Sequence, residues 1–138
     1  MKHSINDIIN IMEQLDIKSG YDISKLPIKY KRAMNSLACC NFRKQLFKRV
    51  EYPESFYFSD QVMNMDNEDF KQTIIHEYAH AYVALESLKN AKVVIKNELG
   101  KYNVLLDDKV ITGYVKESTS LKLKDEIELM IKYLRGEC

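Results

Sequence analysis

Two histidines four residues apart, inside an apolar stretch long enough for one helix, constrain this chain more than any other feature of its sequence. His76 and His80 enclose Glu77-Tyr78-Ala79. In a helix, side chains at positions i and i+4 differ by only about 40° around the axis, so both imidazoles face the same side. Two such rings reach one metal ion without distortion of the backbone. Glu77 then lies beside that ion, where it can take a proton from a zinc-bound water.

The surrounding sequence predicts that the pair lies in the middle of a helix from about Asn67 to Leu88. Asp66 is a candidate N-cap, and Glu68 and Asp69 are carboxylates of the kind that favours a first turn. Apolar residues occur on more than one side of the helix, as a buried central helix requires: Phe70, Ile74, Ile75, Tyr78, Ala79, Val83, Leu85 and Leu88. In such a helix, His and Glu are costly unless they have a function.

Composition predicts one compact α+β domain over residues 1–138. The chain has 46% hydrophobic residues and a formal net charge of +1, enough for a modest core and without a demand for nucleic acid or an anionic membrane. Residues 1–58 nevertheless carry ten Lys or Arg against six Asp or Glu, which leaves a nucleic-acid partner open beside the favoured interpretation of solvated faces.

No uninterrupted apolar segment predicts a membrane span or a secretion signal, so we expect a soluble, cytoplasmic protein. Its three cysteines cannot form a disulfide framework. Cys39 and Cys40 would point to opposite faces of a strand, so at most one of them faces a given site, and buried packing is its favoured role.

The remaining elements follow from periodicity. A first helix is predicted from a Ser4 N-cap to about Asp16, whereas residues 26–30 stay open between strand and helix start. Strands are predicted at 37–42, 45–52, where Pro53 ends the strand, and 55–59. A three-stranded meander is predicted over residues 92–116, with Asp107-Asp108 as a turn, and a last helix over about 120–134.

The segment from residue 37 to 88 resembles the SprT-like zinc metalloprotease family. The resemblance lies in a strand, Phe56-Tyr57-Phe58-Ser59, followed by Thr73-Ile74-Ile75-His76-Glu77 and by Ala79-His80-Ala81. It implies a zincin-like domain with a sheet packed on a central active-site helix. It further implies Zn²⁺ at His76 and His80, Glu77 as general acid/base, and a sheet edge near Phe56–Ser59 that holds an extended substrate.

The chain departs from that family at the third ligand. No histidine follows His80, and there is no Cys-rich zinc ribbon. A catalytic zinc takes three protein ligands and water. Glu126 of the last helix is the predicted third ligand, by analogy with zinc peptidases in which a second helix offers a glutamate. The other candidates are Glu128, Glu117, Glu98, Glu86 and His3; Glu86 would project about 80° away from His76 in an unbroken helix, and an N-terminal His3 is expected to be mobile.

We therefore expect a zinc-dependent metalloendopeptidase that hydrolyses protein or peptide substrates. Tyr78, Tyr82 and Tyr114 are candidates to donate a hydrogen bond to a tetrahedral oxyanion, although each is by default a half-buried aromatic residue. Two alternatives stay open: a regulatory peptidase of the ImmA/IrrE type, which uses a carboxylate as third ligand, and a catalytically silent zincin-like module that binds a protein partner.

Overall fold

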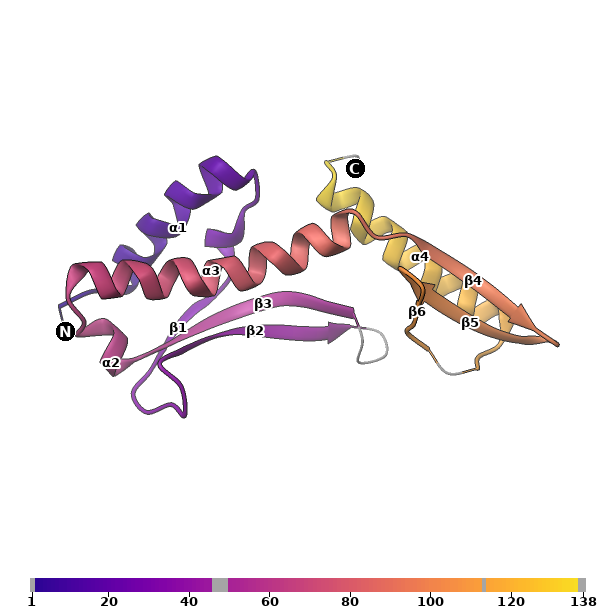
Figure 1. Cartoon of the computed structure of the whole chain (residues 1–138), viewed down its shortest axis with the longest axis horizontal. Helices are drawn as coiled ribbons and strands as arrows, with labels where there is room; N and C mark the ends of the chain where they lie inside the picture. The colour runs from indigo at the N-terminus through magenta and orange to yellow at the C-terminus, as the bar shows by residue number, and fades with distance from the viewer. Residues whose placement is uncertain (1, 46–49, 113, 137–138) are drawn as a thin grey trace. The chain divides into compact units, whose positions relative to one another are not determined.

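The structure, a computed structural model, describes residues 2–45, 50–112 and 114–136. Its contacts divide the chain into two compact units. Unit 1 comprises Met1–Arg43 and Tyr52–Ala84, and unit 2 comprises Lys44–Glu51 and Leu85–Cys138. Helices and small sheets occur together (Figure 1), which confirms the predicted α+β class. The single-domain assignment for residues 1–138 stays a prediction.

Unit 1 begins with α1, Ile5–Ser19. The predicted cap at Ser4 is confirmed, because Ser4 accepts a hydrogen bond from Asp7 N and the Asp7 carboxylate accepts one from Ser4 N. The helix continues three residues beyond the predicted Asp16. It ends at Gly20, whose positive φ of 83° allows its N–H to donate to the Asp16 carbonyl.

The sheet of unit 1 has the order β1-β3-β2. A 3-10 turn, η1 (Ile23–Lys25), leads into β1 (Ile28–Lys31), which resolves the segment left open by the sequence as a strand. This strand runs parallel to β3 (Val50–Ser59), with Ile28 opposite Phe56. The third strand, β2, is Ala38–Gln45.

Three predicted strand boundaries are wrong. β2 continues through residues 43–44, where a connection had been expected, and ends at Gln45. The residues between β2 and β3, 46–49, lie outside the described residues. β3 joins two predicted strands across Pro53. Proline has a φ that fits extended structure, and Pro53 precedes the part of β3 that pairs with β1, which begins at Phe56.

The predicted central helix is confirmed as α3, Asn67–Lys89, which follows the short helix α2 (Asp60–Met63). Asp66 caps α3, since its carboxylate accepts a hydrogen bond of 2.8 Å from Asp69 N. One face of α3 is buried at Phe70, Ile74, Tyr78 and Ala81. It shares the core of unit 1 with side chains from α1, η1, β3 and α2: Ile8, Met12, Ile23, Phe56, Phe58, Val62 and Met63.

Unit 2 contains a three-stranded antiparallel meander and one helix that packs against it. β4 (Val93–Glu98), β5 (Lys101–Leu106) and β6 (Lys109–Val110) pair antiparallel in that order, and α4 (Glu117–Leu134) contacts β4 and β5. The meander and the Asp107-Asp108 turn are as predicted, but the third strand is short and α4 begins three residues early. Within the described ranges, no helix combines the length and the apolarity of a bilayer-spanning segment.

Candidate metal centre

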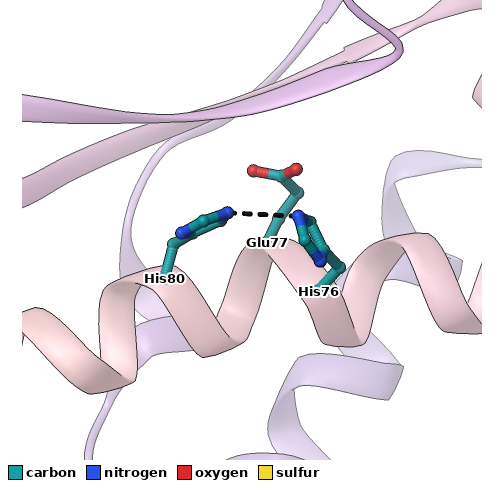
Figure 2. Close-up of side chains that lie close together, drawn as sticks. All are labelled: His76, Glu77 and His80. Atoms are coloured by element: carbon teal, nitrogen blue, oxygen red, sulfur yellow. Dashed lines mark hydrogen bonds between the residues drawn. The ribbon is translucent and has the colours of Figure 1, made fainter.

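His76 and His80 present their Nε2 atoms to each other on the exposed side of α3 (Figure 2). The two nitrogens are 3.1 Å apart, and the ring planes make an angle of 89°. Without a metal, one Nε2–H donates to the other ring. Two nitrogens bound at 2.0–2.1 Å in a tetrahedral zinc site lie about 3.3 Å apart. The observed separation is therefore that of a pair of ligands for one ion.

Glu77 lies between the histidines in sequence but is buried, with 7% of its surface exposed. Figure 2 shows its carboxylate pointing from α3 toward the strands of the sheet. Its oxygen and the two histidine nitrogens lie within 4.8 Å of one another. Among the residues whose side chains are described, no hydrogen bond or ion pair reaches this carboxylate. A carboxylate this close to two imidazole nitrogens favours a cation between them.

The thiols of β2 lie close enough to Glu77 to feel its charge. Burial, followed by the negative charge of Glu77, raises the pKa of the Cys40 thiol to about 12. The same two causes raise the pKa of Cys39, and a hydrogen bond from the Tyr57 backbone opposes them. Both cysteines are free and half-buried. The electrostatic effect of Glu77 therefore extends to both thiols of β2.

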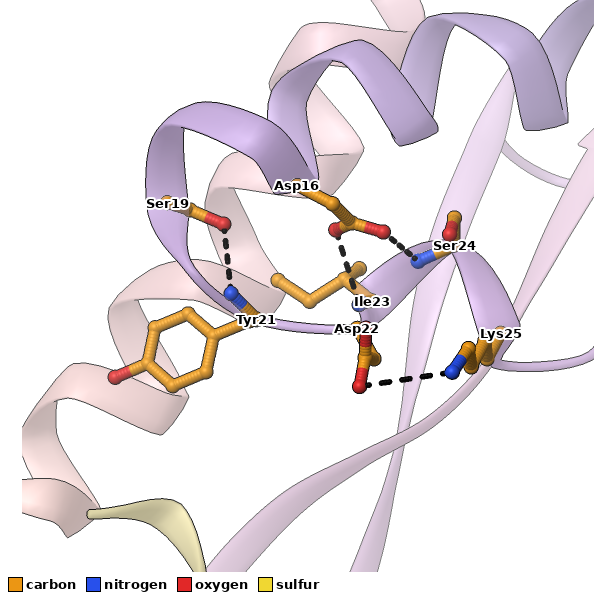
Figure 3. A network of polar contacts seen from close by, with 7 residues as sticks. All are labelled: Asp16, Ser19, Tyr21, Asp22, Ile23, Ser24 and Lys25. Carbon is orange, nitrogen blue, oxygen red and sulfur yellow. Dashed lines mark hydrogen bonds and ion pairs between the residues drawn. The ribbon is translucent and has the colours of Figure 1, made fainter. Parts of the chain in front are cut away.

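The opposite side of α3 is fixed to α1 through Tyr78. The Tyr78 hydroxyl donates to the Asp16 carboxylate at 2.7 Å and lies 2.6 Å from Ser19 Oγ. Asp16 also accepts hydrogen bonds from the backbone N–H groups of Ile23 and Ser24, which start η1 (Figure 3). One carboxylate therefore ties α1, η1 and α3 together. Since its hydroxyl is used there, Tyr78 is not a free donor for an oxyanion.

The other tyrosine candidates have different surroundings. Tyr82 is exposed and makes an edge contact with Tyr21, with ring centroids 5.8 Å apart. Tyr114, in unit 2, is exposed and donates to Glu98 at 3.1 Å. An oxyanion role for Tyr82 or Tyr114 stays a prediction.

Among the candidate third ligands, His3 is packed against the start of α3. Its ring stacks on Phe70 with centroids 3.7 Å apart, and its Nε2 lies 2.8 Å from the Met65 carbonyl oxygen. Phe70 precedes His76 by six residues, about 9 Å along the helix axis. His3 therefore anchors the N-terminal segment to α3 and lies apart from the histidine pair.

The carboxylate candidates lie in unit 2. Glu126 and Glu128 lie on α4, Glu117 is in the first turn of that helix rather than before it, and Glu98 ends β4. Glu98 is already paired with Lys96 at 2.9 Å, and Glu128 with Lys124 at 3.1 Å. Because α3 is unbroken through Lys89, the chain makes no turn before Glu86. The assignment of Glu126 as third ligand stays a prediction.

The predicted substrate edge requires a correction. Phe56–Ser59 belongs to β3, the central strand, whose backbone groups pair with β1. The edge strands of this sheet are β1 and β2. Sequence reasoning missed this because strand order is a tertiary property. Comparisons of the chain with protein-family models, with curated proteins and with solved structures found no match.

Proposed function

We propose that this protein is a zinc-dependent metalloendopeptidase with a zincin-like active-site helix. His76 and His80 hold Zn²⁺, and Glu77 is the general acid/base. The observation that carries the proposal is the pair of Nε2 atoms 3.1 Å apart with a buried carboxylate in the same 4.8 Å group. Imidazole nitrogens are ligands that suit zinc.

A bound zinc ion supplies Lewis acidity, which polarises a peptide carbonyl and lowers the pKa of a water to about 7. With zinc held by His76 and His80, Glu77 would serve as the base that takes a proton from water and as the acid that returns it to the leaving nitrogen. Burial strengthens this role, because a carboxylate with little solvent around it interacts strongly with the charge that develops beside it. The exposed side of the histidine pair leaves access for a polymeric substrate.

The edge of β2 supports an extended peptide as the substrate. Exposed lysines protect the other edge strand, β1, at Lys29 and Lys31, which is how proteins prevent unwanted strand pairing. Residues 38–42 of β2 carry no charge. A peptide that adds to β2 as a further strand would pass next to Glu77.

Two substitutions test the proposal. We expect the purified protein to bind about one zinc per chain, and His80→Ala to lose it, because one imidazole remains. Glu77→Gln should keep the zinc but lose cleavage of fluorescently labelled casein, because the amide cannot take a proton. Zinc is measured by elemental analysis after dialysis. Unchanged zinc content in His80→Ala would exclude this site.

A silent binding module is the second candidate, and the uncharged residues 38–42 of β2 favour it equally. It predicts zinc binding with no cleavage by the wild type, so the casein assay separates the two functions. We also propose a cytoplasmic location, which the free thiols of Cys39 and Cys40 support.

A further inference from the structure

The register of the meander in unit 2 shows which backbone groups of β4 face away from the sheet. β4 is an edge strand in the order β4-β5-β6. The Val104 carbonyl accepts a hydrogen bond from Ile111 N. Tyr102 exchanges both of its backbone hydrogen bonds with Val115. Even-numbered residues of β5 thus direct their backbone groups away from β4, so its odd-numbered residues pair with the even-numbered residues of β4.

Val93, Ile95 and Asn97 of β4 consequently direct their N–H and C=O groups to the open edge. Within the described ranges, no backbone group of another segment bonds to them from that side. β4 contains no proline, and Lys96, whose charge could deter another strand, is paired with Glu98 at 2.9 Å. Alternating donors and acceptors match the backbone of an extended peptide. They do not match a nucleic-acid backbone, which has no N–H donor.

A cavity of about 470 Å³ lies between this part of the chain and α4. No residue of β5 or β6 is in its lining, so it opens on the side of β4 that faces away from β5. The residues of α4 in the lining have the spacing i, i+3, i+4 and i+7 of one helix face: Glu128, Ile131, Lys132 and Arg135. Residues 91–94 form the other wall, and the side chains of Ala91, Val93 and Ile131 are buried. We call this cavity, with the open edge of β4, the β4–α4 groove; it lies within unit 2.

The charges that line the β4–α4 groove are mainly positive. Lys92, Lys132 and Arg135 line it, and Glu128 is the one carboxylate among the described lining residues. Glu128 is already neutralised by a lysine of α4 at 3.1 Å. Lys92 and Lys132 are exposed, and neither forms an ion pair with a described residue. Arg135 donates from Nε to the last backbone carbonyl of α3 at 2.8 Å, which fixes the position of its guanidinium group. The groove therefore combines an apolar floor with an excess of cations, which complements a carboxylate.

We infer that the β4–α4 groove binds an extended, acidic peptide segment of a partner protein, which adds to the sheet as a strand beside β4. The backbone of the segment exchanges hydrogen bonds with Val93 and Ile95. One of its apolar side chains covers Ile131, and a glutamate or aspartate reaches Lys132 and Arg135. This binding is non-covalent and involves neither the histidine pair nor a metal, so it is independent of the proposed zinc site.

The probe is a short fluorescein-labelled peptide in which valine and threonine alternate and glutamates occupy two alternate positions. EDTA is present, so that no metal-dependent cleavage occurs. We expect fluorescence anisotropy to show saturable binding, and the matched peptide with glutamine in place of glutamate to bind on the order of tenfold more weakly. Lys132→Glu should weaken binding of the glutamate peptide by at least about tenfold. Lys122→Glu is the control, because it makes the same charge change on an exposed residue of α4 outside the groove.

A second pair of variants tests the strand edge. Ile95→Pro removes an N–H donor that faces outward and leaves the hydrogen bonds between β4 and β5 in place. It should weaken binding of the peptide by about threefold to tenfold, whereas Ile95→Val, which keeps the donor, should not. If Ile95→Pro folds poorly, exchange of the charges remains as a test. Lys132→Glu should then bind a peptide with lysines in place of the glutamates more tightly than the wild type does.

Three results overturn the inference and leave the proposed metal site intact. They are no saturable binding of the glutamate peptide, equal affinity for the glutamate and glutamine peptides, and equal effects of Lys122→Glu and Lys132→Glu. Loss of binding in Ala38→Pro but not in Ile95→Pro would place the peptide on β2 and would also overturn it. Dimerisation in sedimentation that Ile95→Pro abolishes would assign the groove to a second copy of the chain instead.

Discussion

Tyr78 ties the segment of α3 that carries His76, Glu77 and His80 to α1. It follows Glu77 directly, yet its side chain, 5% exposed, points to Asp16 and Ser19 of α1. Tyr78→Phe removes these hydrogen bonds, and we expect the free energy of unfolding to fall by about 1–2 kcal/mol. Burial, mainly, raises the pKa of Tyr78 above its usual 10.0. The folded state thus holds the phenol proton longer than the unfolded state, so the contribution of Tyr78 to stability is complete below pH 10 and declines above it.

The measurement is urea unfolding of the wild type and of Tyr78→Phe between pH 8 and pH 11. This range is chosen around the reference pKa of tyrosine, about 10. The difference in unfolding free energy between wild type and Tyr78→Phe should shrink above pH 10. A difference that stays constant across this range would contradict a role for the buried phenol.

If the proposed function is correct, an extended substrate adds to the open edge of β2. In the register set by Leu37 and Ser59, odd-numbered residues of β2 pair with β3, and Ala38 directs its N–H to the open edge. Ala38→Pro removes that donor while leaving the bonds to β3 in place. We expect it to lower kcat/KM for casein by about threefold to tenfold, as the loss of one hydrogen bond does, and to leave zinc content unchanged. Ala38→Val, which keeps the N–H, is the control; equal kinetics for the two variants would rule out strand addition at this edge.

For the whole molecule, zinc should couple to stability, because it binds the folded chain and the unfolded chain holds its ligands apart. At zinc concentrations of about 100 times Kd, mass action adds roughly 2.7 kcal/mol. For a chain of 138 residues, this corresponds to a rise in Tm on the order of 10 °C. Calorimetry with zinc and with a chelator measures it, and His80→Ala should show no rise. A zinc-induced shift of the same size in His80→Ala would place the ion elsewhere.

Local physics explains which elements could be predicted. The Ser4 and Asp66 caps, the helix between Asn67 and Leu88 and the β4–β5 hairpin each depend on neighbouring residues, and all are confirmed. The strand boundaries near Pro53 were wrong because proline was taken to end a strand, whereas β3 continues across it.

The sequence by itself determined that two imidazoles would meet, because positions four apart on a helix face one way whatever the rest of the chain does. Only the tertiary structure decided that the Tyr78 hydroxyl is held by Asp16 and that Phe56–Ser59 lies in the central strand. Those contacts join residues far apart in the chain. They depend on strand order and on packing between elements, which no local pattern encodes.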